Sequence, residues 1–138
     1  MSDKRRRALS VMERLRGNEI DQVSRDMATV RAKRDKLAKQ KRELNDKLNR
    51  ERYSDAIEAV PYIASFVDSV RTQIRQIDIQ LKVIEPELAK FEEKLRELYR
   101  EQKVFESVRL KDLREEQAAL AKREAAELEE ITILRWNR

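Results

Sequence analysis

Few side chains in this sequence could perform acid–base or nucleophilic chemistry. The 138 residues include neither Cys nor His, which excludes thiolate nucleophiles, disulfides and imidazole catalysis. Carboxylates occur in adjacent pairs, as at Glu92-Glu93 and Glu129-Glu130, but adjacent residues on a helix diverge by about 100° and form no shared site. Gly17 is isolated, so no glycine-rich phosphate loop exists. We therefore expect no catalytic residue, metal or cofactor, and a protein that is not an enzyme.

Two basic stretches offer a different chemistry, which is contact with phosphates. They read "KRRR" at residues 4–7 and "RAKRDKLAKQKR" at residues 31–42. In a basic-zipper protein the basic region precedes the heptads, whereas here basic and apolar positions interleave. A nucleic-acid-binding coiled coil therefore stays as an alternative, together with a stand-alone structural coil.

The composition indicates long helices. Charged residues make up 43% of the chain, and there are only one Gly and two Pro to interrupt helices. Residues 1–52 hold 17 Lys/Arg and 9 Asp/Glu, a net of +8, while residues 53–138 hold 15 and 18, a net of −3. The two halves would attract each other if they lay side by side.

The second half carries an uninterrupted heptad seam. With Val60 at position a, all twelve a and d positions from Val60 to Leu98 are apolar, which predicts a coiled coil. A poorer seam runs from Ile20 to Leu48 in the first half. Leu9 fits its register, whereas Glu13 and Arg16 break it. Pro86 falls at position f, away from a partner helix, and predicts a bend.

These seams predict an all-α fold, a long antiparallel two-helix coiled-coil hairpin in which helix 2 is longer than helix 1. We expect one domain over residues 1–138, with helix 1 at about 6–51, a turn at about 52–58 and helix 2 at about 58–134. Ser54, Asp55 and Pro61 suit the turn and the following helix start. Folding the chain at residues 52–58 places Leu48 opposite Val60 and Leu9 opposite Leu98. The hairpin would be monomeric.

Two features remain outside the paired seams. Helix 2 continues past Leu98 with irregular apolar residues that we expect helix 1 not to cover; this overhang is either a frayed tail or a surface that a partner covers. Near the turn, a strip off the seam is either ordinary surface or a contact patch, and it contains Tyr62, Phe66, Ser69 and Gln73.

The stretches "YIASFVDSVRTQIRQIDIQL" and "EQKVFESVRLKDLREEQAALAKREAAELEEI" resemble the FliJ-like family of flagellar type III export and its YscO-like relatives in injectisomes. The resemblance implies a hairpin similar to the stalk of rotary ATPases. It also implies a cytoplasmic protein, associated peripherally with the export apparatus at the inner membrane. The implied partners are the hexameric export ATPase, the export-gate membrane protein and export chaperones, with no nucleic acid.

On this reading the chain is a non-enzymatic stalk and chaperone escort with two contact surfaces. The gate protein would contact the turn region, at Tyr53, Tyr62, Phe66, Ser69 and Gln73. The ATPase ring would contact the other end, at Arg5, Arg6, Arg7, Leu113, Leu120, Arg123, Leu128 and Ile131.

Overall fold

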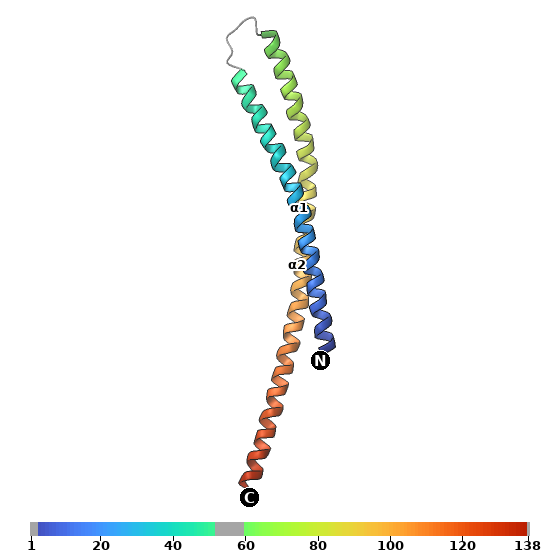
Figure 1. Cartoon of the computed structure of the whole chain (residues 1–138), viewed down its shortest axis with the longest axis vertical. Coiled ribbons are helices and arrows are strands. Elements are labelled where there is room, and N and C mark those ends of the chain that lie inside the picture. The colour runs from blue at the N-terminus through green and yellow to red at the C-terminus, as the bar shows by residue number, and fades with distance from the viewer. Residues whose placement is uncertain (1–2, 52–59, 138) are drawn as a thin grey trace. The chain divides into compact units, whose positions relative to one another are not determined.

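The computed structural model describes residues 3–51 and 60–137, and nearly all of them are helical. Helix α1 spans Asp3–Glu51 and helix α2 spans Val60–Trp136 (Figure 1). The described residues contain no strand, which agrees with the expected all-α hairpin with a longer second helix. The predicted turn residues, including Tyr53, lie outside the described residues.

The chain divides into two compact units, each built from one piece of α1 and one piece of α2. Unit 1 comprises Met1–Asp21 and Arg96–Arg138, and unit 2 comprises Gln22–Leu95. Within each unit the two pieces run antiparallel. In unit 2, Arg31 pairs with Glu92 and Lys41 with Asp78, so that higher numbers on α1 face lower numbers on α2.

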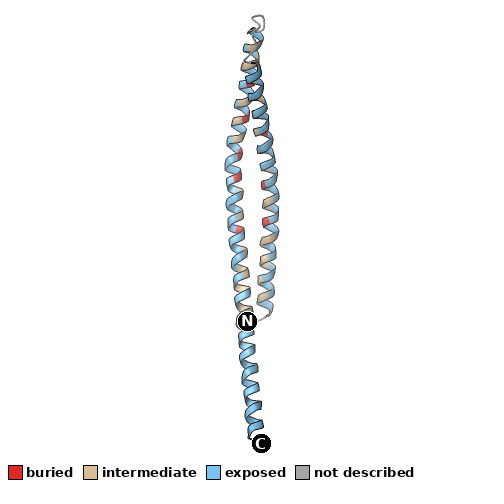
Figure 2. Cartoon of the chain, turned by 90° about the vertical axis from the view of Figure 1, so that its left-hand side faces the viewer, coloured by how far each residue is buried: buried red, intermediate tan, exposed pale blue. Residues whose placement is uncertain are grey.

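An apolar seam holds unit 2 together. Its buried core contains Met27, Leu37, Ile77, Ile84 and Leu88, with five half-buried apolar neighbours packed against it. The predicted α2 seam is correct: all eleven of its residues from Ile63 to Leu98 are buried or half-buried (Figure 2). At about 25 cal/mol per Å² of apolar surface removed from water, this seam is the main stabilising contribution in unit 2.

Helix α2 runs through Pro86 without interruption. The proline and its two neighbours, Glu85 and Glu87, are exposed, as expected for positions that point away from the partner helix. Proline lacks the N–H that would bond to the carbonyl four residues earlier, so the helix loses one hydrogen bond here.

The predicted pairing register was wrong in both units. On the predicted alignment Arg109 would lie beyond the start of the chain, but it lies beside Glu13, and Gly17 lies beside Gln102, so Leu9 does not face Leu98. Leu48 lines a small surface hollow with Val67 and Arg71, which lie further along α2 than the predicted register places them. The prediction folded the chain at residues 52–58 and treated Glu13 and Arg16 as breaks in the seam, so no charged pair was used to set the register.

Candidate interaction surfaces

Within unit 1 the pieces of α1 and α2 pair through a seam that contains charged residues. Carried past Leu98, the heptad of α2 reaches Gln102, Phe105, Arg109, Asp112 and Glu116 at its a and d positions, and the first four of these are half-buried. On α1 the a and d positions at 6, 9, 13 and 16 are half-buried as well, although three of them are charged. The residues that break the apolar pattern on one helix therefore meet those that break it on the other.

The central contact of this charged seam joins Glu13 to Arg109. Arg109 donates from Nε to the Glu13 carboxylate at 2.6 Å and from its terminal nitrogen at 3.3 Å. Gln102 donates to the backbone carbonyl of Glu13 at 3.1 Å. The hydrogen bond to Glu13 is the largest cause of a raised pKa at Arg109, so the guanidinium stays charged under all ordinary conditions.

Other ion pairs flank this contact. Arg16 Nε lies 2.6 Å from the Glu101 carboxylate, without the alignment of a hydrogen bond, and its guanidinium stands 5.9 Å from the centre of the Phe105 ring. Arg6 pairs with Glu116 on α2 and with Asp3 on its own helix, and Arg5 lies 3.9 Å from Asp112. The hydrogen bond to Asp3 is the main cause of a raised pKa at Arg6.

This charged seam was missed in the sequence analysis, and it changes the interpretation of the predicted ATPase contact. Arg5 and Arg6, proposed to contact an ATPase, already have carboxylate neighbours within the chain. Leu113 is half-buried, as are Phe105 and Val108, so the expectation that α1 leaves these residues uncovered was wrong. A signal was available, because the seven-residue register of α2 continues through Glu116 once charged residues are allowed in it.

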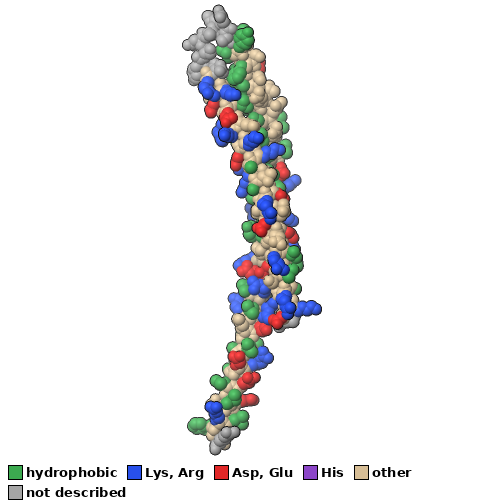
Figure 3. All heavy atoms as spheres, in the orientation of Figure 1, with side chains coloured by type: hydrophobic (Ala, Val, Ile, Leu, Met, Phe, Trp, Pro, Cys, Tyr) green, Lys and Arg blue, Asp and Glu red, His purple; other side chains and the backbone are tan. Residues whose placement is uncertain are grey.

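The uncovered part of α2 begins after Glu116. Every residue from 117 to 137, which we call the overhang, is exposed and helical or in its final turn. Six large apolar side chains are exposed there: Leu120, Leu128, Ile131, Ile133, Leu134 and Trp136. Figure 3 shows such apolar side chains interspersed with acidic ones on this part of the molecule. Arg123, Leu120, Leu128 and Ile131 of the predicted ATPase contact all lie on the overhang.

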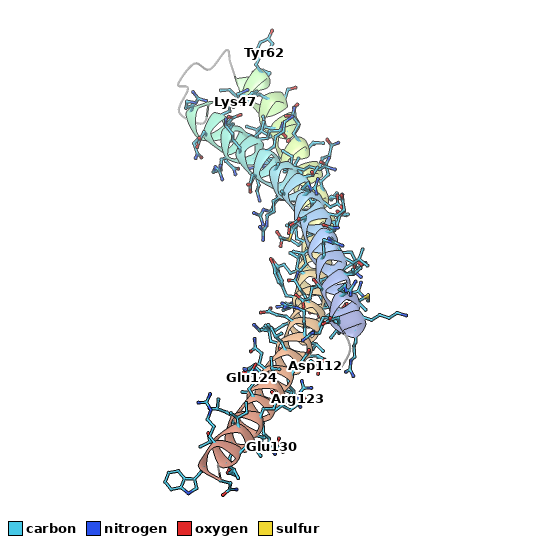
Figure 4. The ribbon with its side chains drawn as sticks, turned by 60° about the horizontal axis from the view of Figure 1, so that its bottom comes forward. Lys47, Tyr62, Asp112, Arg123, Glu124 and Glu130 are labelled. Carbon is cyan, nitrogen blue, oxygen red and sulfur yellow. The ribbon has the colours of Figure 1, made fainter. Side chains whose placement is uncertain are left out.

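The predicted gate contact lies at the start of α2, in unit 2. Tyr62 is 79% exposed and projects from the ribbon (Figure 4). Ser69 and Gln73 are exposed, whereas Phe66 is half-buried and so contributes to packing as well as to the surface. Tyr53 lies outside the described residues.

A groove in unit 2 adjoins the predicted gate contact at Gln73. It has a volume of about 430 Å³ and a floor of apolar seam residues beneath several amide side chains. Its lining residues are Leu37, Gln40, Glu43, Leu44, Lys47, Gln73, Gln76, Ile77 and Gln80. Gln73 therefore belongs both to the predicted contact patch and to this groove.

The basic stretch at 31–42 is partly engaged in packing. Lys41 pairs with Asp78 at 2.7 Å, Arg34 with its neighbour Asp35, and Arg31 lies 4.0 Å from Glu92. Residues 3–51 and 60–137 contain no cluster of three or more His, Cys, Asp or Glu that could hold a metal ion. In the same described part, neither helix is apolar enough over a sufficient length to cross a membrane.

Over residues 3–51 and 60–137, paired antiparallel helices and an uncovered helical end define a helical-hairpin protein. A model of the flagellar FliJ protein family matches residues 5–138, and the chain belongs to this family. It is thus a component of flagellar or type III protein export, in a family whose role is structural, and the predicted resemblance is confirmed. No curated protein and no solved structure compared with the chain matches it.

Proposed function

We propose that this chain is a non-enzymatic stalk of the export apparatus whose overhang binds the hexameric export ATPase. The observation that carries the proposal is that residues 117–137 remain exposed while bearing six large apolar side chains. Apolar side chains gathered on one uncovered helix favour a partner surface that removes them from water. Burying four of them would contribute several kcal/mol before ordering costs.

The start of α2, in unit 2, would contact the export-gate membrane protein. Tyr62 is the strongest candidate, because it is exposed, aromatic and outside the seam, and its neighbours Ser69 and Gln73 are exposed too. Exposed aromatic anchors commonly contribute about 2 kcal/mol or more to an interface. We further propose that the chain acts in the cytoplasm, associated peripherally with the export apparatus at the inner membrane, and that it escorts export chaperones.

The ATPase contact is tested by a chain that ends at Gln117. This truncation keeps Glu116 and the whole charged seam, so circular dichroism should report an intact hairpin. We expect it to lose stimulation of ATP hydrolysis by the purified export ATPase and to keep gate binding. Stimulation that survives truncation would place the ATPase contact elsewhere.

A set of substitutions tests whether the apolar side chains of the overhang, rather than the presence of the helix itself, are needed for ATPase stimulation. Replacing Leu120, Leu128 and Ile131 by Ser should abolish stimulation. The matched control replaces Ile79 and Val83 by Ser, since these are equally exposed apolar residues outside the overhang. The control should stimulate as the unchanged chain does; equal loss in both variants would contradict a specific role for the overhang.

A further inference from the structure

The a positions of α2 repeat a charge pattern beyond the end of α1. From Leu95 they continue at seven-residue intervals as Gln102, Arg109, Glu116, Arg123 and Glu130. The order Arg then Glu therefore occurs twice, 14 residues apart. The first occurrence lies beneath α1, and the second lies on the overhang.

Residues of opposite charge on α1 contact both members of the first Arg–Glu pair. Glu13 accepts hydrogen bonds from Arg109, and Arg6, seven residues before Glu13, pairs with Glu116. We call residues 3–21 of α1 the α1 arm. Its contacts show how a helix antiparallel to α2 can bind an Arg–Glu pair at successive a positions. The helix places a basic residue opposite the Glu and, seven residues later in its own sequence, an acidic residue opposite the Arg.

The second Arg–Glu pair lies where α1 does not cover α2, and the side chains next to it differ from those next to the first pair. Arg123 and Glu130 are exposed side chains of the overhang (Figure 4). Within the described part of the chain neither of them forms an ion pair. Leu113 is half-buried between the residues of the first pair, whereas the equivalent position of the second pair is the exposed Glu127; Leu120 and Leu134, at the same heptad position one repeat to either side, are exposed as well. The d positions before and within the second pair are Ala119 and Ala126, in place of Phe105 and Asp112 at the first, and their small side chains leave room for long charged side chains to cross from a facing helix.

We propose that Arg123 and Glu130 form a docking line for a partner helix that continues the path of α1 along the overhang. This inference rests on the proposed function, in which a partner covers the overhang. The partner helix runs antiparallel to α2 and presents a basic residue to Glu130 and, seven residues further on, an acidic residue to Arg123. It also carries apolar residues against Leu120 and Leu134.

Charge and continuity favour this occupant over others. Between residues 117 and 130 the overhang has four Glu against Lys122 and Arg123, which favours a partner surface with an excess of basic residues. The docking line extends an existing helix–helix interface in the same register, and a helix is the element that presents two residues seven apart on one face. Supercoiling with α2 keeps the line facing the partner, as it does in a heptad coiled coil.

The α1 arm itself provides the probe, because it carries the required order of charges at Arg6 and Glu13. A helix-stapled peptide of residues 3–21 is added to the full-length chain, and binding is followed by fluorescence anisotropy and by hydrogen exchange. We expect saturable binding that protects amides in residues 117–134. The chain variant Arg123→Glu with Glu130→Arg should lose about tenfold in affinity or more, since two ion pairs become two repulsive contacts.

Charge exchange supplies the decisive comparison. A peptide with Arg6→Glu and Glu13→Arg should bind the reversed chain and not the unchanged one. The comparison variant is Lys122→Glu with Glu129→Lys, which reverses the same types of charge at the same spacing on the g positions that flank the docking line. This variant should lose less affinity for the unchanged peptide than the reversal at Arg123 and Glu130.

Three results would overturn the inference. They are absence of binding by the helical peptide, binding that is insensitive to the reversal at Arg123 and Glu130, and protection confined to residues 102–113, where the peptide would merely replace the α1 arm. No ATPase is present in this experiment. If the truncation at Gln117 abolishes ATPase stimulation but the peptide does not bind the full-length chain, the docking line is refuted and the proposed function stands.

Discussion

The ion pair between Glu13 and Arg109 should couple α1 to α2 far more strongly than an ordinary surface pair. Its two hydrogen bonds span 2.6 and 3.3 Å, and the two side chains are 17% and 29% exposed. Hydrogen bonds to charged groups contribute about 1.5–3 kcal/mol, and residual solvent screening lowers this value. We therefore expect a coupling free energy of about 1–2 kcal/mol.

A double-mutant cycle measures this coupling. Glu13→Ala, Arg109→Ala and the double variant are unfolded in urea, and the free energy of unfolding is compared across the four proteins. Each single variant leaves one half-buried charge without its partner, so the double variant should be more stable than the sum of the two single losses predicts. The coupling should shrink in 1 M salt, where the screening length falls to about 3 Å.

A second ion pair serves as the internal control. Arg31 and Glu92 are 4.0 Å apart and 48% and 55% exposed, so their cycle should give a coupling near zero. If the Glu13–Arg109 cycle also gives less than about 0.3 kcal/mol, the charged seam does not stabilise unit 1 and the reasoning fails. Native-state hydrogen exchange in the α1 arm provides an independent measure of the same loss.

Three further predictions concern the fold. Ile84→Asp should destabilise the protein by more than about 3 kcal/mol, because it places an unpaired charge in the core, whereas Val83→Asp, one position away and exposed, should change the melting temperature little. Pro86→Ala should raise the melting temperature through a gain of up to about 3 kcal/mol, since alanine restores the missing helix hydrogen bond; a decrease would show that the proline is needed. Sedimentation at micromolar concentration should give a monomer of 16.5 kDa, and a stable dimer would contradict the intramolecular hairpin.

The sequence by itself determined the elements and the apolar seam. Charged helix-forming residues with almost no glycine or proline leave helix as the only regular structure, and a seven-residue apolar repeat from Ile63 to Leu98 specifies which face is buried. The family resemblance was also readable, since it depends on local residue order. Tyr62 was correctly expected to lie outside the seam, and the role of this residue in binding stays a prediction.

Only the tertiary structure decided the register and hence the extent of the overhang. A heptad pattern repeats every seven residues, so sliding one helix along the other by a heptad preserves most apolar contacts and leaves the alignment open. Charged residues in the seam remove this ambiguity, because Glu13 gains a partner only where Arg109 lies opposite it. In the sequence of each helix taken alone, Glu13 and Arg109 interrupt the apolar heptad pattern. In the folded chain they form an ion pair, and the register that this pair sets moves the start of the uncovered part of α2 from Leu98 to beyond Glu116.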